Sequence, residues 1–182
     1  ESEADLAGLP VLLVEDNVVN QQIAQEILSD AGIAVALADN GLAALELLNA
    51  GGAKAPFALV LMDLQMPVMD GFEATRRIRA LAAAWAKDLP VIAMTAHSRE
   101  SGFEAGYAAG LDDHVSKPIV VSELFAAIRR WLPPGPSPEA EAGIMRGLYD
   151  KARQGDASVA DDLIRYEHLL EPLIHRGRME RL

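Results

Sequence analysis

The stretch Phe57-Ala-Leu-Val-Leu-Met-Asp63-Leu-Gln-Met-Pro67-Val-Met-Asp-Gly71 decides the fold. Six apolar residues are followed by a carboxylate and then by a loop that contains proline and glycine. A short apolar run bounded by turn residues is typical of a strand that is buried on both faces. Asp63 therefore stands where the strand ends, which is where open α/β sheets place the groups that meet ligands. On its own Asp63 would more simply be a turn or cap residue, so its role depends on the other strand ends.

Three further apolar runs predict strands over 10–14, 33–37 and 90–94, and a short fifth strand is predicted over 112–116, ending at Lys117-Pro118. Between them the sequence predicts a helix capped by Asn17, a helix beginning near Leu42, and helices over 72–85, 98–109 and 121–132. Five alternations of strand and helix indicate a parallel sheet with helices on both faces. The expected fold class is α/β: a flavodoxin-like, doubly wound, five-stranded sheet of order 2-1-3-4-5, with a short C-terminal helical extension.

Helical spacing also predicts which side chains face inward. In the first helix, Ile23, Ile27 and Leu28 form an apolar stripe. In the helix over 72–85, the arginines at 76, 77 and 79 are expected to face mostly outward. Gly102 and Gly106 weaken the fourth helix by about 1 kcal/mol each, which either keeps a switching element soft or has no functional meaning.

Composition limits the classes of function. The 182 residues include no cysteine, which excludes disulfides and thiolate metal sites, and carry a net charge of −11. Residues 1–143 hold 9 basic and 20 acidic side chains, so a nucleic-acid surface is not expected. No run is long enough to span a bilayer. The sequence does not begin with methionine, which suggests a piece of a longer protein. We expect this piece to lie in the cytoplasm, whether or not its parent protein is anchored in a membrane.

Charged and hydroxyl side chains end four of the predicted strands. Because parallel strands end at one edge, Glu15, Asp16, Asp63, Thr95 and Lys117 should converge. Crowded carboxylates are favourable mainly when a cation neutralises them, and all-oxygen ligands point to Mg²⁺. A lysine suits a phosphate, and a threonine hydroxyl can donate to a phosphoryl oxygen. Together these groups describe phosphoryl transfer to a carboxylate.

The motifs also resemble a known family. The segments are Val14-Glu15-Asp16-Asn17, Asp63-Leu-Gln-Met-Pro67-Val-Met-Asp-Gly71, Thr95-Ala96 and Ser116-Lys117-Pro118. They occur in the order and at the spacing of response-regulator receiver domains of two-component signalling, and the resemblance covers about residues 8–132. Asp16-Asn17-x-x-Asn20 and Gly110-Leu-Asp-Asp-His-Val-Ser-Lys-Pro118 look most like the receiver of a hybrid sensor histidine kinase.

The resemblance implies roles for five of these residues. Asp63 would be the phosphoacceptor, taking a phosphoryl group from a partner's phosphohistidine. Asp16, Asp63 and the backbone carbonyl of Gln65 would bind Mg²⁺, with Glu15 assisting through a metal-bound water. Lys117 would pair with the phosphoryl group.

The resemblance also implies two residues that change conformation on phosphorylation and two residues that set the lifetime of the phosphoryl group. Thr95 would turn to form a hydrogen bond to the phosphoryl group. His114 stands where many receivers carry Tyr or Phe, and its side chain would swing inward when Thr95 moves. The alternative is that His114 is a surface histidine without a switching role. Gln65 and His97 would flank the water that removes the phosphoryl group, or would be exposed loop residues without kinetic effect. The Lys117–Pro118 peptide bond would be cis.

Beyond the receiver, 133–143 is interpreted as a proline-rich linker and 144–182 as a helical tail. The tail could be a histidine-phosphotransfer module with His168 or His175 as phosphoacceptor. Neither histidine stands in that family's His-x-Leu-Lys-Gly setting, so ordinary helix-surface histidines are favoured.

Two classes of function follow. In the first, the chain is the phosphoacceptor receiver of a phosphorelay, catalyses its own phosphorylation and dephosphorylation, and belongs to a hybrid histidine kinase. In the second, it is a stand-alone or phosphate-independent interaction module with the receiver shape. The expected partners are a histidine kinase core or a histidine-phosphotransfer protein. Nucleic acid and membrane are not expected as partners, and a homodimer is left open.

Overall fold

The structure is a computed structural model that describes residues 6–96, 103–132, 146–147, 150 and 153–154. The chain divides into two compact units, Glu1–Pro133 and Pro134–Leu182. In the second unit, the described residues 146–147, 150 and 153 are helical. The interpreted linker over 133–143, most of the tail over 144–182, and His97 lie outside the described residues, so the interpretations made of them stay predictions.

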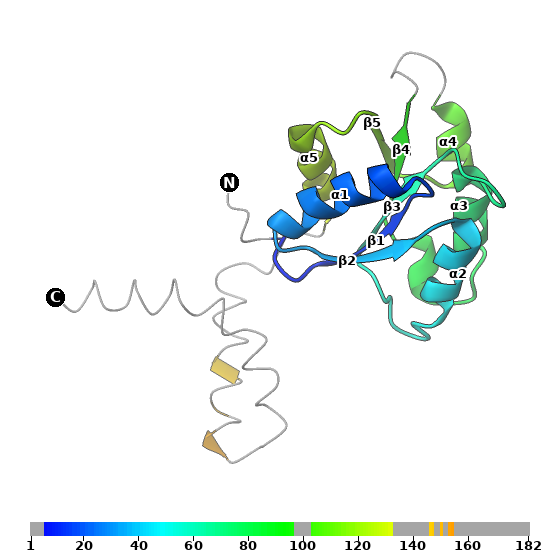
Figure 1. Ribbon diagram of the computed structural model, residues 1–182. Helices are drawn as coiled ribbons and strands as arrows, with labels where there is room; N and C mark the ends of the chain where they lie inside the picture. The colour runs from blue at the N-terminus through cyan, green and yellow to red at the C-terminus, as the bar shows by residue number, and fades with distance from the viewer. Residues whose placement is uncertain (1–5, 97–102, 133–145, 148–149, 151–152, 155–182) are drawn as a thin grey trace. The chain divides into compact units, whose positions relative to one another are not determined.

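Five parallel strands form the sheet of the first unit (Figure 1). They are β1 (Pro10–Val14), β2 (Ala34–Ala38), β3 (Leu59–Asp63), β4 (Val91–Thr95) and β5 (Asp113–Ser116). The order β2-β1-β3-β4-β5 confirms the predicted flavodoxin-like topology. In the centre, β3 pairs with β1 and β4, and all five of its residues are buried.

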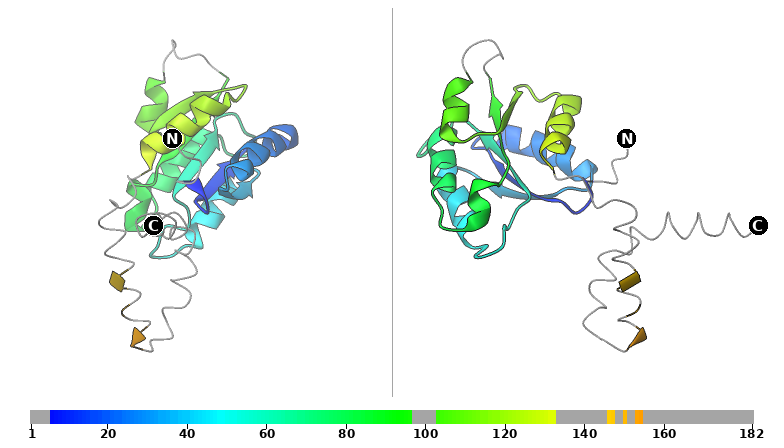
Figure 2. Two further views of the ribbon diagram at one scale, coloured as in Figure 1. Left: turned by 90° about the vertical axis from the view of Figure 1, so that its left-hand side faces the viewer. Right: turned by 180° about the vertical axis from the view of Figure 1, so that it is seen from behind.

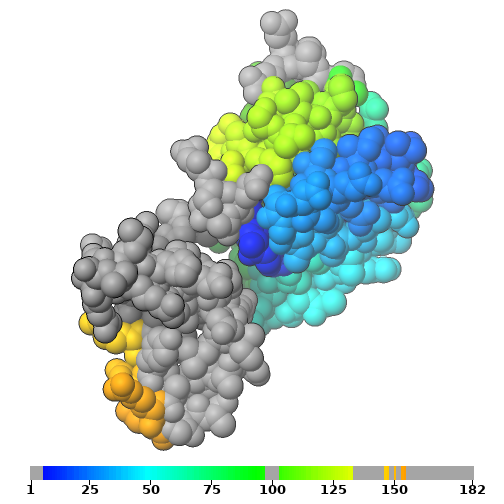
Figure 3. All heavy atoms as spheres, turned by 60° about the vertical axis from the view of Figure 1, so that its left-hand side comes forward, coloured from blue at the N-terminus to red at the C-terminus, as the bar shows by residue number. Residues whose placement is uncertain are grey.

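Helices cover both faces of this sheet. They are α1 (Val18–Asp30), α2 (Gly41–Asn49), α3 (Gly71–Arg79), α4 (Glu104–Ala109) and α5 (Val121–Trp131), with a 3₁₀ helix, η2 (Ala84–Lys87). Figures 1 and 2 show α1 and α5 on one face and α2, α3 and α4 on the other. In Figure 3, α1 in blue and α5 in yellow-green lie side by side on the outer surface. Every helix within the described ranges is too short or too polar to cross a lipid bilayer.

The core consists of two apolar layers, one on each side of the sheet. Alternate residues of β1 and β3 supply them: Leu12 and Met62 pack toward α2 and α3, whereas Leu13 and Leu61 pack toward α1 and α5. These four side chains are fully buried, and each contributes roughly 1.5–3 kcal/mol to folding. The carboxyl ends of the strands are thereby held in fixed positions.

Polar caps start three helices directly after the preceding loop. The side chains of Asn17, Asn40 and Asp70 accept hydrogen bonds from free backbone N–H groups in the first turns of α1, α2 and α3. Such a cap contributes about 1 kcal/mol. The Asn17 cap confirms the predicted start of the first helix. Asn17 lies only three residues after Val14, the last residue of β1.

One predicted orientation in α3 is wrong. The helix ends at Arg79 and not at Trp85, and the Arg79 side chain is only 17% exposed. Its guanidinium donates to the carbonyl oxygens of Gly110 and Leu89 and to a carboxylate oxygen of Asp112. It turns inward because the segments at Leu89 and at 110–112 bring acceptor oxygens to it. Arg76 and Arg77 do face outward, where both pair with Glu73.

A second predicted orientation is wrong in α1. Ile23 is 47% exposed, and the buried residues of this helix are Gln21, Ala24 and Leu28. Their spacing of three and four residues defines the inward face. A buried glutamine was not expected there; it is tolerated because its amide donates hydrogen bonds to the backbone oxygen of Glu15 and to Asp39.

The last turn of α5 is tied to the edge strand β5 through a buried carboxylate. Asp113 lies in β5 and is buried. Its Oδ2 accepts hydrogen bonds from the guanidinium of Arg130 and from the indole N–H of Trp131, the latter at 2.9 Å. This contact fixes the end of the first unit against its own sheet.

Candidate functional site

A cavity of about 230 Å³ opens at the carboxyl ends of β1, β3 and β4. Its walls contain six of the residues singled out from the sequence: Glu15, Asp16, Asp63, Gln65, Thr95 and Lys117. Asn17, Asn20, Met94 and Ala96 complete the lining and were not predicted to do so. Asn17 and Asn20 stand in the motif quoted for the family resemblance, which was the available signal.

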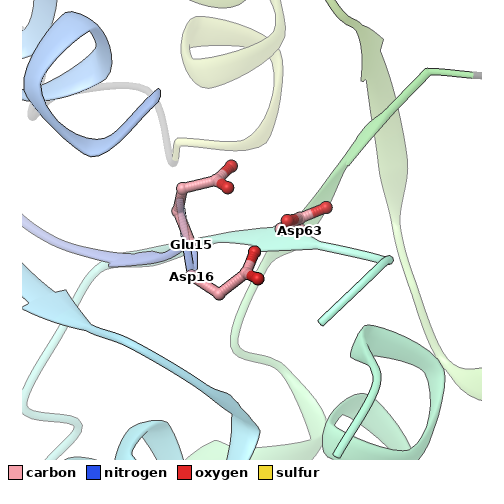
Figure 4. A group of neighbouring side chains, drawn as sticks. All are labelled: Glu15, Asp16 and Asp63. Carbon is pink, nitrogen blue, oxygen red and sulfur yellow. The ribbon is translucent and has the colours of Figure 1, made fainter. Parts of the chain in front are cut away.

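Three carboxylates form the acidic side of this cavity. Glu15 and Asp16 directly follow β1, and Asp63 is the last residue of β3; Figure 4 shows them beside one another. One carboxylate oxygen from each lies within 4.8 Å of the others. Glu15 is 2% and Asp63 is 4% exposed, so water screens their mutual repulsion poorly.

Lys117 directly follows β5 and supplies the opposing charge, 102 positions after Glu15. Its Nζ lies 2.8 Å from Glu15 Oε2 and 3.2 Å from Asp63 Oδ1. Burial lowers the pKa of the Lys117 ammonium, but its hydrogen bond to Glu15 and the charge of Asp63 outweigh burial and raise that pKa above its usual value. Lys117 is therefore a fixed positive charge. The Lys117–Pro118 peptide bond that follows is cis, as predicted.

Asp63 is the perturbed acid of the group. Burial raises its pKa from 3.8 to about 6, helped by the negative charge of Glu15. The backbone N–H of Gln65, 3.1 Å from Asp63 Oδ1, and the Lys117 ammonium lower the pKa without cancelling that rise. One ammonium thus faces two buried carboxylates and a third nearby, which leaves the site short of positive charge.

The loop after Asp63 folds back tightly on the strand end. The backbone N–H of Gly71 donates to the carbonyl oxygen of Leu64 at 3.2 Å. A Cβ at position 71 would lie 2.4 Å from the carbonyl oxygen of Asp63, so no other residue fits without moving the strand end. This close approach holds Gln65 at the cavity wall, where its side chain is exposed.

Two further residues were expected to act as switches. Thr95 is buried at the end of β4, in register with Ser116 of β5, and lines the cavity. His114 lies outside the cavity lining; its ring packs on Phe103, with centroids 4.4 Å apart. Both ring nitrogens are buried, without a hydrogen-bond partner in the described part of the chain. His114 is thus not a simple surface histidine, and its switching role stays a prediction.

Gly106 of α4 makes room for this aromatic contact. A Cβ at Gly106 would lie 2.8 Å from the ring of Phe103, which stacks on His114 and meets Tyr107 edge-on. The glycine therefore has a packing role that neither interpretation of it from the sequence included. The aromatic partner of His114 was also missed, because no local pattern links residues eleven positions apart.

Comparison with protein families matches residues 11–129 to the response regulator receiver domain. A curated relative, the probable histidine kinase 2 of Oryza sativa subsp. indica, is 37% identical over 138 residues. That match covers 70% of this chain and 13% of the relative, so this chain spans about an eighth of the length of that kinase.

Solved structures agree. The receiver domain of sensor histidine kinase PA1611 from Pseudomonas aeruginosa PAO1, which has a magnesium ion coordinated in its active-site cleft, is 35% identical. It superposes with a TM-score of 0.58 over 69% of this chain and 98% of that one. A co-crystal structure of the Saccharomyces cerevisiae histidine phosphotransfer protein Ypd1 with the receiver domain of Ssk1 matches at 30% identity and TM-score 0.60, covering 69% and 90%. The chain belongs to the response regulator receiver domain family of two-component signalling.

Proposed function

We propose that Asp63 accepts a phosphoryl group from a phosphohistidine of a partner protein. The observation that carries this proposal is the Lys117 ammonium held against Glu15 and Asp63 at the open edge of the sheet. An Asp63 oxygen would form a bond to phosphorus as the donor's phosphorus–nitrogen bond breaks, and the donor histidine would leave as imidazole. Above a pH of about 6, Asp63 is ionised and therefore nucleophilic.

The donor set fits a magnesium ion. Three carboxylates lie close together, and neither His nor Cys stands among the described residues that line the cavity. Asp16, Asp63 and the backbone carbonyl of Gln65 would hold the ion, with Glu15 acting through a water. When bound, it would neutralise charge on the phosphoryl oxygens. The magnesium-containing PA1611 receiver supports this assignment.

The remaining lining residues would act on the transferred group. Lys117 would turn from its carboxylate partners to a phosphoryl oxygen, as a point charge suits phosphate. Thr95 would donate its hydroxyl hydrogen to a second oxygen, and Gln65, with His97, would set how long the acyl phosphate survives. The added charge of about −1.5 to −2 would bias Thr95, His114 and β5 toward a second arrangement.

The surface beside the cavity suits a protein partner. Val18 and Val19 open α1, Val120 and Val121 stand at the start of α5, and all four are exposed. These two helices lie side by side (Figure 3), and exposed apolar side chains at the starts of both supply surface of the kind that binds proteins. The Ssk1 receiver in complex with Ypd1 supports a phosphotransfer protein or a kinase core as the occupant.

We infer further that the chain is the receiver part of a hybrid sensor histidine kinase, because the matched relative is a histidine kinase and this chain spans only 13% of it. The phosphorelay would then operate in the cytoplasm, where the ATP that feeds such kinases is found.

The test is phosphorylation by a small donor. Incubation with Mg²⁺ and acetyl phosphate should add the mass of one phosphoryl group to the intact protein, and removal of Mg²⁺ with EDTA should abolish the addition. Asp63→Asn should remain unmodified. Asp70→Asn is the matched control, since asparagine also caps α3, and it should be modified like the wild type. An unmodified wild type would instead favour the phosphate-independent interaction module, and a modified Asp63→Asn would contradict the assignment of Asp63 as the phosphoacceptor.

A further inference from the structure

Gln21 is the polar member of an otherwise apolar inward face of α1. It is 7% exposed, and the other buried residues of this helix are Ala24 and Leu28. A buried amide costs free energy unless its donors find acceptors. What Gln21 does for the molecule therefore depends on the groups that its amide contacts.

The amide nitrogen of Gln21 joins two loops that follow neighbouring strands. Its Nε2 donates to the carbonyl oxygen of Glu15 at 2.6 Å and to Oδ1 of Asp39 at 3.0 Å. Glu15 directly follows β1, and Asp39 directly follows β2. Because an amide nitrogen carries two hydrogens, both donors are used. Gln21 thus links the ends of the two strands from behind the acidic cavity.

The bond to Glu15 acts where the sheet no longer holds the chain. The pairing of β1 with β2 and with β3 ends at Val14. The carbonyl oxygen of Glu15 and the N–H of Asp16 belong to one planar peptide unit. The Gln21 bond therefore orients the peptide unit that leads into Asp16. Figure 4 shows the Glu15 and Asp16 side chains leaving the chain at this point.

Other contacts fix the side chain of Glu15 but not this peptide unit. The Glu15 carboxylate accepts from Lys117 Nζ at 2.8 Å and from the backbone N–H of Asn17 at 3.2 Å. Both bonds end on carboxylate oxygens. The backbone direction at Asp16 depends instead on the carbonyl that Gln21 holds.

We propose that Gln21 is a positioning residue for the magnesium site: it holds the Glu15–Asp16 peptide so that the ligands are in place before the ion binds. This inference rests on the proposed function, in which Asp16 binds the ion directly and Glu15 binds it through a water. Ligands that are already ordered lose less conformational freedom on binding. Residues that orient metal ligands without touching the metal typically change the affinity by about 10–100-fold.

The experiment measures the dissociation constant for Mg²⁺ by isothermal titration calorimetry, without a phosphodonor. Gln21→Met keeps the length of the side chain and removes both donors, so the dissociation constant should rise about tenfold. Gln22→Met is the control at the exposed neighbouring position. Leu28→Val is the control for stability, because it disturbs the same inward face away from the cavity. Both controls should keep the wild-type dissociation constant.

A second pair of variants tests the other bond of Gln21. Asp39 is exposed, so its replacement leaves the fold intact. Asp39→Ala removes one acceptor of the amide and should raise the dissociation constant about threefold. Asp39→Asn removes the same charge but keeps an acceptor oxygen, and should give a smaller rise. Equal rises in the two variants would assign the effect to the charge of Asp39 and overturn the inference.

Phosphorylation by acetyl phosphate separates positioning of the ion from the reaction. At saturating Mg²⁺, Gln21→Met should be phosphorylated at the wild-type rate, while the Mg²⁺ concentration that gives half of this rate should rise about tenfold. A lower rate at saturating Mg²⁺ with an unchanged half-saturating concentration would contradict a positioning role.

The remaining outcomes distinguish this inference from the proposed function. An unchanged dissociation constant in Gln21→Met, or an equal rise in Leu28→Val, would overturn the inference, and phosphorylation of the wild type would leave the proposed function standing. A wild type that binds Mg²⁺ but is not phosphorylated would refute the proposed function, whereas a raised dissociation constant in Gln21→Met would still support positioning of the ion. A wild type that does not bind Mg²⁺ would refute the inference.

Discussion

The two ends of the sheet use charge in opposite ways. At the amino ends of β4 and β5, one guanidinium, that of Arg79, is surrounded by carbonyl oxygens and the Asp112 carboxylate, and Asp112 also accepts from the N–H of Val91. At the carboxyl ends, one ammonium faces crowded carboxylates. The first end is electrostatically satisfied and stabilises the fold. The second has more negative than positive charge, which favours the binding of a cation.

The largest effect on stability should come from breaking the satisfied end. Arg79→Met leaves several buried acceptors and the Asp112 carboxylate without their donor, and should lower the free energy of unfolding by roughly 3 kcal/mol. Thermal unfolding should show a melting temperature lower by about 10 °C. Arg77→Met is the matched control two residues away. Among the described residues its side chain pairs with exposed Glu73, so the melting temperature should change by about 1 °C or less. Equal effects of the two substitutions would contradict the contrast.

The second largest effect on stability should come from removing the positive charge at the carboxyl ends of the strands. Lys117→Met removes the cation beside Glu15 and Asp63, and in EDTA should lower the free energy of unfolding by about 2 kcal/mol. Mg²⁺ should then raise the melting temperature of the variant by more than it raises that of the wild type, since the ion becomes the remaining positive charge. The same titration with Ca²⁺ and K⁺ would show whether charge alone suffices. A smaller response to Mg²⁺ in the variant would contradict this account of the site.

The smallest effect has the opposite sign. In EDTA, Asp63→Asn should stabilise the protein by roughly 1–2 kcal/mol at neutral pH, because it removes one of the crowded charges. The raised pKa of Asp63 sets the pH window. The protonated carboxyl favours the folded state, and this contribution is full below a pH of about 4 and lost as the pH rises through about 6. The stabilisation by Asn should therefore be greatest above pH 7 and shrink toward pH 4. A constant difference in melting temperature across this range would refute the raised pKa.

The acidic cavity at the carboxyl ends of the strands was predicted well from the sequence. The apolar runs predicted four of the strands to within two residues, and the short strand over 112–116 was predicted to within one. Parallel topology then required Glu15, Asp63 and Lys117 to meet at one edge. This worked because strand ends are a property of the sheet, and short apolar runs mark them without knowledge of distant contacts.

The cluster around Arg79, at the amino ends of β4 and β5, was not predicted from the sequence, and the reason is also physical. The partners of Arg79 are mainly backbone carbonyl oxygens, which every residue has, and they come from segments up to 31 positions away. No pattern of side chains in the sequence predicts such a cluster. The same limit applies to Gln21, whose buried amide donates to the backbone oxygen of Glu15.

The buried Asp113 of β5 has a consequence for the register of this edge strand. An outer strand with free backbone groups is a template for pairing with another molecule. A shift of β5 out of register would separate the buried carboxylate from Arg130 and Trp131 and leave its charge without these partners. That cost holds β5 in its register at the edge of the sheet.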